Sequence, residues 1–161
     1  AALMVIWSRL CIHKPRWKGM LQVRAVSSSF NAYVAAGTSG GGIQTFTRAD
    51  DLPCQDPEAT CTVRVRYSTL NYKDGMIVQG HKGVVTPPGK FPIVPGIDAA
   101  GEVIECSVGK YQPGDRVVVT GNKIGQHFDG GYSQVLRVKS EWLTPLPQSF
   151  SLEESMMIGS A

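Results

Sequence analysis

Three functional side chains stand close together in residues 67–75, where a strand pattern gives way to a helix pattern. Asn71, Tyr72 and Asp74 bring an amide, a phenol and a carboxyl group to this stretch. Polar groups that gather with an aromatic ring at the end of a rigid element suit a ligand site. The sequence therefore predicts a small-molecule site with Asn71, Tyr72 and Asp74 as its candidate residues.

A strand and a short helix should position these side chains. Apolar and polar residues alternate over residues 61–68, the period of a half-buried strand. Asn71 is a good N-cap for a helix over residues 72–78, and Asp74 would lie in its first turn, where the helix dipole favours a negative charge. Structural alternatives remain open: Asp74 could stabilise the helix start and pair with Lys73 or an arginine, and Tyr72 could pack in the core.

The rest of the chain consists of short β-prone runs and tight turns. Residues 30–36 and 43–47 predict a hairpin across the glycine-rich segment 37–42. That segment is not a phosphate-binding loop, because a β-prone run follows where a helix N-terminus is needed. Further on we expect a strand at 102–104, a type II turn at 113–114, strands at 116–120 and 132–138, and a helix that begins with a capping box at 151–154. The pattern predicts a mainly β barrel or sandwich.

Composition indicates one globular domain after a basic extension. The chain has 161 residues, 42% hydrophobic and 18% charged. All acidic residues lie beyond residues 1–28, and the remainder is near neutral, which gives a nucleic-acid partner no electrostatic support. No apolar run approaches the roughly 18 residues that a membrane-spanning helix needs, so no membrane partner is expected.

Residues 1–28 have the composition of an organellar transit peptide, basic and without acidic residues. Met4 and Met20 leave a second interpretation open, in which the segment is translated upstream sequence of a mis-started frame. A true presequence predicts a mitochondrial or plastid matrix location, and the alternative predicts a cytoplasmic one.

Four cysteines, at positions 11, 54, 61 and 106, lie far apart without a Cys-x-x-Cys pair. Widely spaced cysteines of this kind favour reduced thiols in a reducing compartment. A disulfide stays open as the alternative.

Several motifs resemble one known family in the same order along the chain. They are Tyr67-Ser68-Thr69-Leu70-Asn71-Tyr72-Lys73-Asp74-Gly75, Pro95-Gly96-Ile97-Asp98-Ala99-Ala100-Gly101, Gly130-Gly131-Tyr132-Ser133-Gln134 and Met157-Ile158-Gly159-Ser160-Ala161. Over roughly residues 30–161 the chain resembles the zinc-free acrylyl-CoA reductase, or quinone oxidoreductase, group of the medium-chain dehydrogenase/reductase superfamily.

The resemblance implies a GroES-like domain over residues 29–161, a partly open β-barrel with short helices, truncated in its last helix. In full-length members a Rossmann domain follows, and the nucleotide lies between the two domains. The strand, glycine-rich turn and helix of that fold are not found in this sequence. We therefore expect weak NADPH binding at best, little activity alone, and self-association through an apolar surface at residues 156–158.

The chemistry that the resemblance implies is hydride transfer from NADPH to an activated C=C bond of an enoyl thioester, with a quinone as the alternative substrate. Asn71 would orient the reacting groups, Tyr72 would pack on the nicotinamide or give the proton, and Thr120 would join both in binding the cofactor. Asn71, Tyr72 and Lys73 would be the hydrogen-bond donors to the developing enolate.

The resemblance also implies that no metal takes part. Zinc-dependent relatives carry Cys and His where Asn71 and Ile97 stand, and Glu where Asp98 stands; an amide and an isoleucine are unsuited to zinc. A second class of function stays open as well, in which the chain is a non-catalytic GroES-like module that binds a partner.

Overall fold

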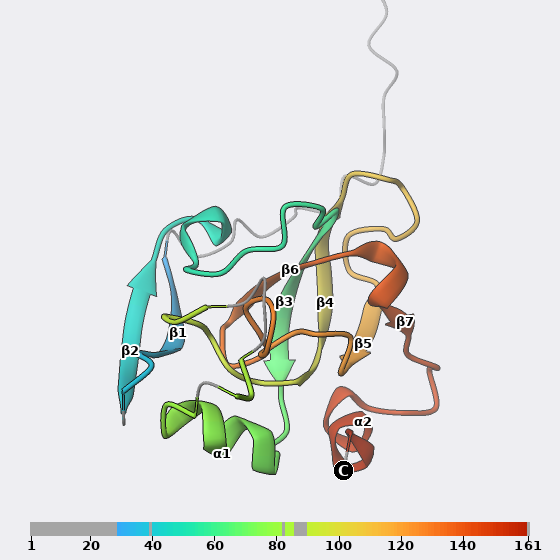
Figure 1. The fold of residues 1–161 in the computed structure, drawn as a ribbon. Coiled ribbons are helices and arrows are strands. Elements are labelled where there is room, and N and C mark those ends of the chain that lie inside the picture. The colour runs from blue at the N-terminus through green and yellow to red at the C-terminus, as the bar shows by residue number, and fades with distance from the viewer. Residues whose placement is uncertain (1–28, 39, 82, 86–89, 161) are drawn as a thin grey trace, which may run out of the picture.

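The computed structural model describes residues 29–38, 40–81, 83–85 and 90–160. A five-stranded antiparallel sheet with the order β6-β3-β4-β5-β7 stands beside a two-stranded hairpin, and two short helices lie at one end of the sheet (Figure 1). The elements are β1 (Phe30–Ala35), β2 (Gly41–Phe46), η1 (Ala49–Asp51), β3 (Cys61–Tyr67), α1 (Tyr72–Val78), β4 (Asp98–Cys106), β5 (Arg116–Thr120), β6 (Val135–Val138), η2 (Ser140–Trp142), β7 (Thr144–Pro145) and α2 (Leu152–Ile158). The mainly β prediction is confirmed, whereas the interpretations of residues 1–28 lie outside the described residues.

The hairpin is tied to the sheet by its first strand. β1 and β2 pair antiparallel as predicted, and the rings of Phe30 and Phe46 stack at 5.8 Å between centroids. Isolated bridges then join Ala32 to Ser133 and Ala35 to Ile93. These bridges connect the hairpin to the segments that flank the five-stranded sheet.

The main core is formed by buried side chains from the strands of the larger sheet and the loops beside them. Its fully buried side chains include Val63, Val117, Leu136 and Val138. β3 and β4 approach so closely that a Cβ on Gly101 would lie 2.0 Å from the carbonyl oxygen of Arg64. The small residue at position 101 is therefore a requirement of the strand contact, as the sequence indicates.

β3 loses its alternation before it ends. Its register against β4 shifts between Val65 and Tyr67, and the Tyr67 side chain is 43% exposed rather than inward-facing. β6 is shorter than predicted because Tyr132 and Ser133 are used elsewhere: the Tyr132 amide donates to the Pro95 carbonyl, and Ser133 bridges to β1. Register irregularities of this kind re-aim side chains near functional sites.

The cysteine prediction is wrong for two of the four residues. Cys61 and Cys106 face each other in the β3–β4 register and form a disulfide across 45 residues. Cys54 is a free, buried thiol, and Cys11 lies outside the described residues. Antiparallel pairing brings together two cysteines whose separation in sequence gave no sign of contact.

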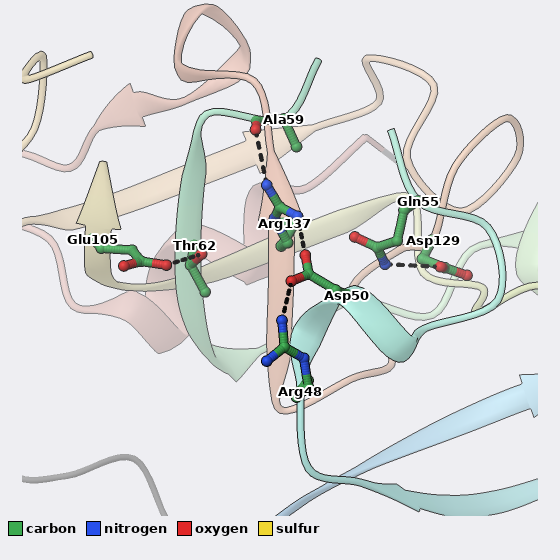
Figure 2. A network of polar contacts seen from close by, with 8 residues as sticks. All are labelled: Arg48, Asp50, Gln55, Ala59, Thr62, Glu105, Asp129 and Arg137. Atoms are coloured by element: carbon green, nitrogen blue, oxygen red, sulfur yellow. Dashed lines mark hydrogen bonds and ion pairs between the residues drawn. The ribbon is translucent and has the colours of Figure 1, made fainter. Parts of the chain in front are cut away.

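A polar network fastens η1 and the following loop to the sheet (Figure 2). Asp50 forms ion pairs with both Arg48 and Arg137, and the second guanidinium nitrogen of Arg137 donates to the Ala59 carbonyl at 3.2 Å. These groups are partly solvated, so each pair adds little to stability. The network holds the outer edge of β6, away from α1.

Candidate functional site

The site residues gather where three strands end beside the two helices. β3 runs into α1 through Asn71, the N-cap of the helix. Asp98 begins β4 and is the Cα partner of Thr120 at the end of β5. The residues after α2 return to the same place, because Ser160 hydrogen-bonds to Asp98. The predicted helices at 72–78 and after Ser151 are both confirmed.

Asp98 is buried at the centre of the first of two hydrogen-bond clusters in the site. Its side chain is 0% exposed. Oδ2 accepts hydrogen bonds from Thr69 Oγ1 at 2.7 Å, Asn71 Nδ2 at 2.9 Å and the Ser160 amide at 3.0 Å, and Oδ1 accepts one from the Ser160 hydroxyl. Burial by itself raises the pKa of Asp98, but these hydrogen bonds outweigh it and hold the pKa below the ordinary value.

Asp74 is buried at the centre of the second hydrogen-bond cluster. Its Oδ1 accepts hydrogen bonds from the amides of Gly96 at 2.9 Å and Ile97 at 3.2 Å, and its Oδ2 accepts one from the Asn71 amide at 3.0 Å. Burial raises the pKa of this carboxyl more than the hydrogen bonds lower it. The carboxylate caps the helix start through the Asn71 amide, and it also ties the helix to the distant loop that contains Gly96 and Ile97.

Tyr132 connects the two hydrogen-bond clusters. Its hydroxyl donates to the Thr69 carbonyl at 3.0 Å and lies 3.3 Å from Asp74 Oδ2. Burial, with the neighbouring Asp74 charge, raises the pKa of Tyr132 above its ordinary value. The phenol therefore stays protonated and acts as a donor at neutral pH.

Tyr72 lies on the outside of this buried network. Its side chain is 84% exposed, so packing in the core of this domain is excluded for it. Tyr72 and the half-buried Asn71 line a cavity of about 360 Å³ together with Leu70, Gly75, Met76, Gln79 and His81. An open aromatic ring beside an amide offers a flat apolar face and a polar anchor to a planar ligand.

The structure brings the four predicted site residues to one end of the sheet and separates them by burial. Asn71 and Tyr72 reach the cavity, Thr120 is exposed at the end of β5, and Asp74 is fully buried. Sequence reasoning missed Thr69 and Ser160 as polar partners and treated Asp98 only as a position in a motif. The only signal in the sequence was that these three residues lie in the motifs that carry the family resemblance.

Two further expectations concern metal and the apolar surface. Among the described residues, no three His, Cys, Asp or Glu side chains gather as a metal site, and no helix there is long and apolar enough to cross a membrane. Met157 and Ile158 are 75% and 65% exposed, as expected, but Met156 is buried at 8% exposure because it faces the sheet. The exposed apolar surface therefore contains two of the three predicted residues, Met157 and Ile158.

Comparison with known proteins identifies the family. Residues 57–148 match the alcohol dehydrogenase GroES-like domain. Acrylyl-CoA reductase AcuI of Ruegeria pomeroyi is 42% identical over 133 residues, which cover 82% of this chain and 39% of the relative. The chloroplastic quinone-oxidoreductase homolog of Spinacia oleracea is 34% identical over 110 residues, which cover 65% of this chain and 31% of that protein.

The fold comparison agrees. YhdH of Escherichia coli K-12, solved with bound NADPH, superposes with a TM-score of 0.70 at 33% identity and covers 80% of this chain and 38% of its own. The chain belongs to the GroES-like domain family of the medium-chain dehydrogenases/reductases. It spans about 40% of the length of these relatives or less.

Proposed function

We propose that this chain is the substrate-side part of an NADPH-dependent reductase that saturates the C=C bond of an enoyl thioester. The observation that supports it most directly is the cavity at the start of α1, where Asn71 and the exposed Tyr72 ring stand over the buried Asp98 network. When bound, NADPH would supply a hydride to the β-carbon, and a proton would go to the α-carbon, giving NADP⁺ and the saturated thioester.

The residues present fit only the nicotinamide end of such a cofactor. Tyr72 offers its ring face, Asn71 an amide, and Thr120 a hydroxyl at the end of the neighbouring strand. No strand followed by a glycine-rich turn and a helix N-terminus, which would bind the pyrophosphate, occurs among the described residues. We therefore propose that the isolated 161-residue chain binds NADPH weakly and turns over little.

Each site residue then has a role in the proposal. Asn71 orients the reacting groups, and Tyr72 covers the nicotinamide and is the candidate proton donor through its phenol. Thr120 contacts the cofactor from the β5 side. Asp74, with no exposed surface, is a positioning residue that holds the Gly96–Ile97 loop against the start of α1; the alternative, in which it takes part in proton transfer, needs an opening of the site.

A chimera tests the proposal. Residues 29–161 replace the matching segment of the Ruegeria pomeroyi reductase, and loss of NADPH absorbance is followed with acrylyl-CoA and with a short quinone. We expect the faster turnover with acrylyl-CoA, and a decrease of about 100-fold in kcat/KM for Asn71→Ala. Gln148→Ala, which removes an exposed amide from the loop before α2, is the matched control and should leave the rate unchanged.

Three results are informative. A higher kcat/KM with the quinone favours the quinone reductase alternative, for which the spinach relative's name is the supporting observation. A folded chimera that binds NADPH but reduces neither substrate supports a non-catalytic module. Micromolar NADPH binding by the 161-residue chain alone, measured by calorimetry, contradicts the proposed weak binding.

The proposed location follows the same relative. The spinach protein is named as chloroplastic, which supports an organellar location for this chain, with the cytoplasm as the alternative. Fusion of residues 1–28 to a fluorescent protein distinguishes the two, because only a functional presequence directs the fusion to an organelle.

A further inference from the structure

We infer that Asp98 is a positioning residue that fixes the side-chain amide of Asn71 in one orientation, with the nitrogen toward Asp98 and the carbonyl oxygen turned away from it. The geometry carries this inference by itself. It rests on the proposed function only for the identity of the ligand.

The orientation follows from counting hydrogens. An ionised carboxylate has no hydrogen to donate, and the hydrogen bonds to Asp98 keep its pKa low, against the effect of burial. The Asn71 side-chain atom 2.9 Å from Asp98 Oδ2 must therefore be the nitrogen. An amide turned by 180° would place two oxygens against each other in a buried site.

Thr69 lies beside Asp98 on the same side of the amide nitrogen. The Thr69 hydroxyl donates its hydrogen to Asp98 Oδ2 at 2.7 Å, which leaves its oxygen lone pairs as acceptors. Asn71 Nδ2 lies 2.8 Å from that oxygen. The two acceptors are so close together that one Nδ2 hydrogen can serve both, and both turn the nitrogen toward the protein.

The atom of the amide that is turned away from Asp98 is Oδ1. It takes part in the capping box of α1 and, with two lone pairs, can accept one more hydrogen bond. The group that binds there must be a donor, such as the carboxamide NH₂ of a nicotinamide or a ribose hydroxyl. An enolate oxygen carries no hydrogen and cannot bind to Oδ1, whereas Tyr72 and Lys73, both exposed in the first turn of α1, can donate to it.

The first test does not depend on any ligand. In NMR spectra of the 161-residue chain, the Nδ2 proton of Asn71 that faces Asp98 should exchange with water at least about tenfold more slowly than those of Asn122, which makes one exposed hydrogen bond to the Thr120 carbonyl. Equal exchange rates for the two asparagines would overturn the inference whatever the function of the chain.

Two variants separate positioning from general stability. Asp98→Asn can keep an oxygen toward Asn71 and turn its NH₂ to the Ser160 hydroxyl, so slow exchange should survive; Asp98→Ala should abolish it. Thr69→Val keeps the Asp98 bond and remains useful if Asp98→Ala fails to fold: the Nδ2 proton that faces Asp98 should stay slow. Fast exchange of both protons in Thr69→Val would show that Asp98 does not hold the amide.

A cofactor analogue identifies the donor. In the chimera, NADPH is compared with its 3-acetylpyridine analogue, which has a methyl group in place of the carboxamide NH₂. The analogue should bind about tenfold more weakly than NADPH to the unsubstituted chimera. NADPH and the analogue should bind equally to the Asn71→Ala variant. An equal penalty in both proteins would refute the carboxamide as the donor and leave a ribose hydroxyl, to be tested with deoxyribose analogues; slow Nδ2 exchange without any cofactor binding would count against the proposed function alone.

Discussion

Replacement of Asp74 by alanine should destabilise the domain far more than an ordinary helix-cap substitution. The carboxylate is fully buried and accepts hydrogen bonds from three backbone amides, those of Asn71, Gly96 and Ile97. A buried donor left without a partner costs about 1–3 kcal/mol. Gly96 and Ile97 are both buried, so their two amides alone correspond to a loss of about 2–6 kcal/mol in the free energy of unfolding.

The magnitude is measurable by thermal or urea unfolding followed by circular dichroism. For a domain of this size a loss of about 4 kcal/mol lowers Tm by roughly 8–16 °C. Asp74→Asn is the matched comparison: its oxygen can still accept from Gly96 and Ile97, and the new NH₂ group faces the Asn71 amide and the Tyr132 hydroxyl, whose oxygen can accept from it, so the loss should be about half as large. A decrease in Tm of less than about 3 °C for Asp74→Ala would refute the reasoning that these amides depend on the carboxylate.

The remaining predictions concern other parts of the domain. Burial raises the pKa of Asp129 to about 6, so the stability that the protonated carboxyl contributes is fully present below the ordinary pKa of aspartic acid and is lost as pH rises through 6. NMR titration of the carboxyl carbon should show a midpoint near 6, and Asp129→Asn should flatten that part of the pH–stability curve. A midpoint near 4 would contradict the effect of burial. Gly101→Ala should prevent normal β3–β4 pairing, seen as a loss of cooperative unfolding, because its Cβ would lie 2.0 Å from the Arg64 carbonyl oxygen; a native melting curve would disprove the close contact. Alkylation of the denatured, unreduced chain should label Cys54 and spare Cys61 and Cys106 in mass spectra; labelling of all three would mean that the disulfide is not formed.

Local chemistry accounts for the elements that sequence analysis predicted correctly. The β-prone run of β3, the glycine-rich turn between β1 and β2, and the Ser151–Glu154 capping box of α2 each depend on interactions within a few residues. The capping box forms as predicted, with the Glu154 amide donating to Ser151 Oγ at 3.1 Å. Such signals persist in the folded chain because nothing distant competes with them.

Contacts between distant segments account for what sequence analysis missed. The Cys61–Cys106 bond depends on the register of two strands, and the exposure of Tyr67 depends on an irregularity in that same register. Neither register nor its shifts can be read from one strand, since a slip of one residue moves every side chain to the other face.

The candidate site divides along the same line. Residue types alone marked Asn71, Tyr72 and Asp74 as functional candidates, because an amide, a phenol and a carboxyl group followed a strand at its end. Only the tertiary structure decided that Asp74 is buried, that Tyr72 is open, and that Asp98 and Ser160, 62 residues apart, are bonded to each other. Hydrogen bonds to a buried carboxylate are made between segments that pack together, so their partners are set by the fold and not by spacing along the chain.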